Sequence, residues 1–232
     1  MNFIHSGDDF AFGKGDNSRL GSPPGVAKHL CHKIMNERKV KHVWQFFNQG
    51  IIGSNSRDWL PRSNLIINHD RVGKKNLFEK VFSSKNTESV EVVIIFLGFN
   101  DSAAAIPPEE TVQNIVSICR VLRNLGKDVW LSTICNLGDK TRGFSDALIE
   151  GNLRRNEGLI EYLKNEGKKD GVLAGPRIDA ESYEFRTKDF LTPDGIYFNN
   201  KGYLKLSKDF CDLIATSLVK REFDAMKSLL GF

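Results

Sequence analysis

Short apolar runs alternate along the chain with longer stretches in which apolar residues recur every three or four positions. The run Val92–Leu97 is the most apolar and predicts a buried central strand. Helical spacing, as in Val26, Leu30 and Ile34, predicts amphipathic helices between the strands. Strands separated by helices need crossover connections, which favour a mainly parallel sheet with helices on both faces. The pattern therefore predicts an α/β protein, a three-layer α/β/α sandwich around a mainly parallel sheet.

The bounds of the other elements follow from shorter apolar runs and from turn residues. Further strands are predicted at Asn2–His5, His42–Phe47, Asp128–Ile134 and Gly171–Leu173. Helices are predicted at Ser22–Arg38, Pro107–Asn124, Asp146–Glu166 and Gly202–Lys220, with room for a further turn or two after the last. No proline-, glycine- or serine-rich linker interrupts this order, so residues 1–232 are expected to form one domain.

Composition and charge narrow the class of protein. Hydrophobic residues make up 40% of the chain and charged residues 27%, which is typical of a globular protein. The net charge of +4 is small and its basic residues are dispersed, which does not favour nucleic-acid binding. No apolar stretch approaches the ~20 residues that span a bilayer, and the first residues lack the pattern of a secretory signal. The four cysteines form no CxxC pair, so we expect an intracellular, cytoplasmic protein without a structural zinc site.

Three loops are expected to meet at one edge of the sheet, because ligands of parallel α/β sheets bind where the strands end. They are Gly7–Gly13, Asn48–Ser54 and Gly98–Ser102. Each follows or adjoins a predicted strand, and each is rich in glycine and small polar residues. The chemistry of the chain is therefore expected at this edge.

The sequences of these loops resemble those of the SGNH/GDSL hydrolases. Gly7-Asp8-Asp9 resembles the block that carries the nucleophile, and Asn48-Gln49-Gly50-Ile51-Ile52-Gly53 resembles the second block, NxGxxG. Gly98-Phe99-Asn100-Asp101 resembles the GxND block, and Asp194-Gly195-Ile196-Tyr197 resembles the DxxH block. The blocks occur in family order over nearly the whole chain, so the resemblance implies the flavodoxin-like SGNH-hydrolase fold.

The resemblance also implies roles for individual residues. In that family a serine attacks an acyl carbonyl, a histidine takes its proton, and an aspartate orients the histidine. Carried over by position, Gly50 and Asn100 match the oxyanion hole and Asp194 matches the orienting acid. Asp9 stands where the serine belongs, and Tyr197 stands where the histidine belongs.

These two replacements remove the usual mechanism. A carboxylate at Asp9 cannot form the serine acyl-enzyme, and a tyrosine with a pKa near ~10 is a poor general base at neutral pH. We expect the Asp9 carboxylate to accept hydrogen bonds from the Gly50 amide and from Asn100, as a built-in oxyanion. Asp8 is expected to tie the loop down through backbone amides.

Two hypotheses from different classes follow. In the first, the chain is a catalytically degenerate member of the family that binds a small-molecule ligand in the former active-site pocket or a protein partner. In the second, it is an active hydrolase on ester, acetyl or glycosyl substrates, with Asp9 as nucleophile or base and Tyr197 as acid. Asp8, Asp9, Asn100 and Asp194 also offer oxygens to a hard cation, but the motifs do not favour a metal site, and no cofactor is predicted.

Other residues near this edge have plainer interpretations. Ser54 and Ser102 are interpreted as loop or cap hydroxyls, and Trp59 as packing beneath the edge. His69 is the loop histidine with acidic company, and a solvated loop is its favoured interpretation. The segment Pro61–Ser89 is poorly constrained by the family pattern, so features specific to this protein are expected there.

Overall fold

A parallel sheet forms the centre of the computed structural model, which describes all residues except 17–23, 62–75, 83–86, 137–143, 185–186 and 232. In the described part of the chain its strands are β1 (Asn2–Gly7), β2 (Gln45–Gly50), β3 (Val92–Phe96), β4 (Asp128–Leu131) and β5 (Val172–Ala174). Their order is β2-β1-β3-β4-β5, and all neighbouring pairs are parallel. The predicted α/β fold with a mainly parallel sheet is confirmed.

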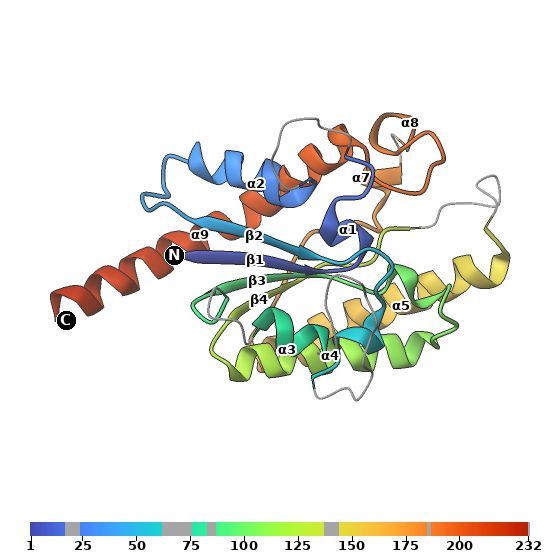
Figure 1. The fold of residues 1–232 in the computed structure, drawn as a ribbon, viewed down its shortest axis with the longest axis horizontal. Coiled ribbons are helices and arrows are strands. Elements are labelled where there is room, and N and C mark those ends of the chain that lie inside the picture. The colour runs from blue at the N-terminus through green and yellow to red at the C-terminus, as the bar shows by residue number, and fades with distance from the viewer. Residues whose placement is uncertain (17–23, 62–75, 83–86, 137–143, 185–186, 232) are drawn as a thin grey trace.

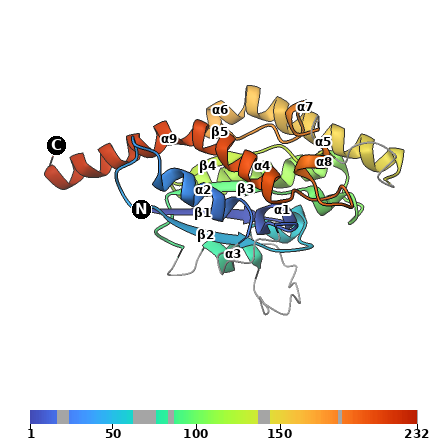
Figure 2. The same cartoon turned by 90° about the horizontal axis from the view of Figure 1, so that it is seen from above.

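Helices cover both faces of the sheet (Figures 1 and 2). The longer helices are α2 (Val26–Met35), α4 (Pro108–Asn124), α5 (Asp146–Asn165) and α9 (Asn200–Leu230). The shorter ones are α1 (Asp9–Phe12), α3 (Leu77–Phe82), α6 (Gly167–Asp170), α7 (Glu181–Glu184) and α8 (Thr187–Phe190). Single 3₁₀ turns, η1 (Ser56–Trp59) and η2 (Phe99–Asp101), follow β2 and β3. Helices α2 and α9 lie on one face, and α3, α4 and α5 on the other (Figure 1). No helix in the described ranges is long and apolar enough to cross a membrane.

The central strand β3 shows why its sequence is continuously apolar. Every side chain of β3 is buried, because both faces of the sheet are covered. Val92, Ile94 and Phe96 pack into the core beneath α2 and α9. Val93 and Ile95 alternate with them and pack into the core beneath α4 and α5. β3 therefore contributes side chains to both cores.

The second strand lies three residues later than the prediction of His42–Phe47. β2 pairs with β1 from Gln45 opposite Asn2 to Gly50 opposite Gly7. Trp44 lies just before the strand, where its indole Nε1 donates a hydrogen bond of 3.0 Å to Glu222. The consequence for the site is that Asn48 and Gly50, expected in a loop, belong to the strand itself.

Helix α9 is longer than the expected Gly202–Lys220. Asn199 caps its start, since the Asn199 side chain accepts hydrogen bonds from the amides of Lys201 and Gly202. At the other end the helix continues to Leu230, and its last turns extend past the sheet (Figure 1). The predicted start of α2, at Ser22, lies outside the described residues, and the helix itself begins at Val26.

The buried His5 in β1 gives a prediction about pH. Burial lowers the pKa of His5 to about 4, although the backbone of Ala11 acts in the opposite direction. Between pH 6.5 and 4 the unfolded chain therefore binds the proton more readily, so stability is lost as pH falls. From pH 7 to pH 5 the loss that His5 contributes is expected to be about 2 kcal/mol. Urea unfolding of the wild type and His5→Leu at both pH values measures it, and an equal loss in both proteins would contradict it.

Candidate functional site

The end of β1 places two adjacent carboxylates at the edge of the sheet. Gly7 has a φ of +139°, and a Cβ there would lie 1.6 Å from the carbonyl oxygen of Phe96, so only glycine allows the chain to turn here. Asp8 then caps α1 by accepting a 3.1 Å hydrogen bond from the Phe10 amide, and its other oxygen accepts one of 3.0 Å from Phe99. Burial raises the pKa of Asp8 to about 8, although these two amides lower it. Asp8 thus joins the first loop to the third.

The Asp9 side chain lies at the meeting point of the three loops. Its Oδ2 accepts a 2.6 Å hydrogen bond from the Asn100 amide and one of 2.8 Å from the backbone N–H of Gly53. Its Oδ1 accepts a 2.9 Å hydrogen bond from the ammonium group of Lys14. With 2% of its side chain exposed, Asp9 is held by three donors, one of them charged. An amide N–H and an asparagine donate to the negative oxygen, as in an oxyanion hole.

Lys14 is a site residue that the sequence analysis missed. Its Nζ donates to Asp9 and also, over 2.8 Å, to the Tyr197 hydroxyl, and it lies 4.3 Å from the centroid of the Tyr197 ring. It therefore joins Asp9 and Tyr197, the two residues that the family resemblance places at the positions of the serine and the histidine. A basic residue five positions after Asp9, just past the C-terminal end of α1, was the available signal.

The charges of these three groups reinforce one another. Burial alone would raise the pKa of Asp9, but the hydrogen bonds from Asn100, Gly53 and Lys14 outweigh it and hold that pKa below its ordinary value. Burial of Tyr197 raises its pKa, although Lys14 lowers it, so the phenol stays protonated at neutral pH. The site at neutral pH is an ion pair beside a neutral tyrosine, without a general base at position 197.

The expected contact between Gly50 and Asp9 is wrong. The Gly50 amide donates 3.0 Å to the side chain of Asn48, and a Cβ on Gly50 would lie 1.9 Å from the Phe12 nitrogen. Gly50 therefore allows α1 to lie against β2, and the amide that faces Asp9 belongs to Gly53. The reason is the later register of β2, which takes Gly50 into the strand and leaves Gly53 in the loop.

The hydrogen bonds that Asp194 accepts come from its own turn and not from the residues around Asp9. Its Oδ1 accepts hydrogen bonds of 2.5 Å from the Thr192 hydroxyl and 3.0 Å from the Ile196 amide. Both contacts close the turn that precedes Tyr197, whose own hydroxyl is bound by Lys14. The structure thus brings together Asp9, Asn100 and Tyr197, whereas Asp194 shapes the turn that carries the tyrosine.

Aromatic rings fill the space around this cluster. The Phe10 ring packs on Phe99 at a centroid distance of 4.9 Å and on Tyr197 at 5.9 Å. The hollow beside them, which Asp8 and Cys135 help to line, has a volume of about 10 Å³. That volume is about the size of one water molecule, which is too small for an acyl chain.

The hydroxyl groups of Ser54 and Ser102, close to the site, form hydrogen bonds with groups other than Asp9. Ser54 donates 2.8 Å to the carbonyl of Ile51 and accepts from the indole of the buried Trp59. Ser102 accepts a 2.7 Å hydrogen bond from the guanidinium of Arg155. These contacts support the interpretation of both serines as structural. His69 and residues 62–75 of the segment Pro61–Ser89 lie outside the described residues.

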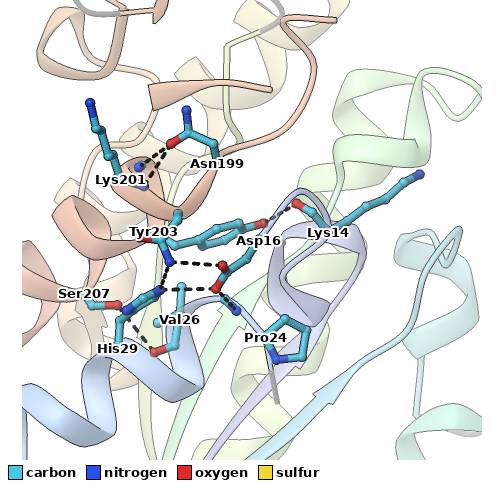
Figure 3. A network of polar contacts seen from close by, with 12 residues as sticks. Lys14, Asp16, Pro24, Val26, His29, Asn199, Lys201, Tyr203 and Ser207 are labelled. Atoms are coloured by element: carbon cyan, nitrogen blue, oxygen red, sulfur yellow. Dashed lines mark hydrogen bonds and ion pairs between the residues drawn. The ribbon is translucent and has the colours of Figure 1, made fainter. Parts of the chain in front are cut away.

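A buried polar network holds the chain segment that carries Lys14 (Figure 3). The Tyr203 hydroxyl donates 3.0 Å to the Lys14 carbonyl. Two residues further on, Asp16 accepts a 2.9 Å hydrogen bond from the Gly25 amide and lies 3.1 Å from Nε2 of His29. Burial lowers the pKa of His29, against the opposing effect of Asp16. The network fixes the backbone of this segment, and the Lys14 side chain points away from the network (Figure 3). Its Nζ donates to Asp9 instead.

Comparisons with known proteins agree with this architecture. The model of the GDSL-like lipase/acylhydrolase family matches residues 6–205. A lipase/acylhydrolase from Enterococcus faecalis is 18% identical, with 92% of this chain and 95% of that chain covered and a TM-score of 0.62. For an acetylxylan esterase from Geobacillus stearothermophilus the identity is 14%, the coverage 91% and 92%, and the TM-score 0.63. TesA is 16% identical, with 92% of this chain and 98% of that chain covered and a TM-score of 0.61. The search of curated proteins gave no significant match. The match to the family model spans most of the chain, which therefore belongs to the GDSL-like lipase/acylhydrolase family.

Proposed function

We propose that this chain is a catalytically inactive member of its family that acts as a binding or interaction protein. The observation that carries the proposal is the Asp9 carboxylate, whose Oδ2 accepts hydrogen bonds from both the Gly53 amide and Asn100. A substrate carbonyl would need these same donors to stabilise its developing negative charge. The Asp9 carboxylate always occupies these donors, so it would compete with the substrate oxygen for them.

The other partners of Asp9 support the same conclusion. Lys14 neutralises the carboxylate at 2.9 Å, so the ion pair is satisfied without a ligand. The family resemblance puts Asp9 and Tyr197 at the positions of the serine and the histidine, and the loss of both can cost on the order of 10⁶ in kcat in a triad enzyme. A fold that keeps its three loops joined in this way offers a rigid surface for a partner or ligand.

The alternative is an active hydrolase that uses Asp9 as nucleophile or base. For attack, one Asp9 oxygen would have to leave its donors and approach the substrate, and both oxygens are engaged here. The engaged oxygens of Asp9 therefore favour the inactive protein over the hydrolase.

Hydrolysis of p-nitrophenyl acetate and butyrate separates the two. The proposal predicts the same background rate with wild type and with Asp9→Asn, which keeps the size of the side chain and removes its charge. Turnover by the wild type that disappears in Asp9→Asn would overturn the proposal and make Asp9 the reacting carboxylate. Circular dichroism of both proteins controls for folding.

A further inference from the structure

The end of α9 presents an apolar side that nothing in the described structure covers. Buried positions in this helix continue to Glu222, and beyond that residue the side chains are exposed except at Ala225, which is partly buried. Phe223, Met226 and Leu230 are 50%, 48% and 64% exposed. Their spacing of three and four residues places them on one side of the helix. This is the pattern of a helix that docks into an apolar groove.

A groove of matching character lies on the opposite side of the molecule. It runs between α4 and α5 and has a volume of about 760 Å³. Its apolar lining comes from Val112, Val116, Val121 and Tyr162. Gly158 in α5 lets Val112 approach closely, since a Cβ there would lie 2.8 Å from a Val112 methyl group.

The charges of the groove leave an acidic surplus. Two ion pairs neutralise part of its lining: Arg120 with Glu166, and Arg154 with Glu109. Glu157 and Glu161, also in the lining, form no ion pair within the described part of the chain. They are four residues apart on α5 and are both exposed, so they form an acidic rim along one side of the groove.

The end of α9 carries the complementary charge. Lys220 and Lys227 are exposed and seven residues apart, so they lie on one side of the helix, next to the apolar residues. The exposed Asp224 lies between them on the same side, so these three groups together carry a net charge of +1. The Lys227 ammonium lies 4.9 Å from the centroid of the Phe223 ring, which places the cation at the edge of the apolar side. An apolar side with a small basic surplus along one edge thus faces solvent on one part of the molecule, and an apolar groove with an acidic surplus does so on another.

We propose that the end of α9 of one copy of this chain binds in the α4–α5 groove of a second copy. The end of α9 lies far from the groove of its own chain (Figures 1 and 2), so the contact must be intermolecular. Because the two surfaces are different, the contact is either made twice in a two-fold dimer or repeated head to tail in a ring or an open chain of copies. It uses none of the residues around Asp9, so it stands whether or not the chain hydrolyses esters.

Sedimentation velocity over a range of protein concentrations tests this proposal. The wild type is expected to associate as concentration rises. The tail variant Lys220→Glu/Lys227→Glu and the groove variant Glu157→Lys/Glu161→Lys are each expected to associate at least about 10-fold more weakly. All four side chains are exposed, and circular dichroism and thermal unfolding check that both variants keep the fold.

Mixing the two variants gives the sharpest readout. The acidic tail of one variant then meets the basic groove of the other, and the basic tail meets the acidic groove, so association is expected to return. A wild type that stays monomeric at all concentrations would overturn the proposal. So would a groove variant that associates as strongly as wild type, which would indicate contact between two tails.

Discussion

Replacing Asp9 with serine together with Tyr197 by histidine is expected to create an esterase from a chain that we propose to be catalytically inactive. The Gly53 amide and the Asn100 side chain already point at the Asp9 oxygen, so removing that carboxylate frees the donors for a substrate carbonyl. Histidine at position 197 supplies the missing base. Because positioned acid–base catalysis contributes about 10²–10⁴-fold, the double variant is expected to hydrolyse p-nitrophenyl acetate at least about 100-fold faster than wild type.

Single variants provide the controls for this gain. Asp9→Ser alone lacks the base, and Tyr197→His alone keeps the carboxylate on the donors, so both should stay near background. Adding Asn100→Ala to the double variant should lower the new activity by removing one donor. A folded double variant that is as inactive as wild type would show that these donors cannot serve a substrate, and would contradict our description of the site.

Gly50→Ala is expected to destabilise the protein by more than about 3 kcal/mol. A Cβ at Gly50 would lie 1.9 Å from the nitrogen and 2.4 Å from the Cα of Phe12, and backbone atoms of a helix cannot give way as a flexible side chain would. The turn that carries Asp9 would have to move away from β2. Urea unfolding followed by circular dichroism measures the loss.

Gly53→Ala is the matched control, because both changes add one methyl group to the same motif. A Cβ at Gly53 would meet no atom within 4 Å, and only its φ of +78° is unfavourable. A left-handed conformation costs a non-glycine residue about 1–2 kcal/mol, so this variant should lose less than Gly50→Ala. Equal losses, or a larger loss for Gly53→Ala, would contradict the close approach of α1 to β2.

The layered fold and the meeting of the three loops could be predicted from sequence because both depend on local patterns. The continuous apolar run of β3 identifies a strand buried on both faces, and the alternation of strands with helices implies parallel pairing. Since parallel strands end at one edge of the sheet, the loops that follow β1, β2 and β3 had to meet there. The amino-acid sequence alone is therefore enough to place Asp9 beside Asn100.

The contacts inside the site depend on register and reach, which local patterns do not contain. The choice between the amides of Gly50 and Gly53 is made by the pairing of β2 with β1, which extends the strand to Gly50. Lys14 enters the site because a long side chain spans from the end of α1 to both Asp9 and Tyr197. The separate position of Asp194 results from the turn that it closes with Thr192. No spacing of residues along the sequence indicates any of these contacts.

The pKa of Asp9 tests most directly the claim that an ionised carboxylate occupies the donors of the oxyanion hole. It can be measured by following the Asp9 carboxyl carbon by NMR during a pH titration of labelled protein. We predict a pKa below the ordinary value of 3.8, since the hydrogen bonds from Asn100, Gly53 and Lys14 outweigh the effect of burial. Lys14→Met and Asn100→Ala should each raise it, as each removes a group that favours the ionised form. A pKa above 3.8 in the wild type, unchanged by these substitutions, would show that burial dominates and would contradict the account.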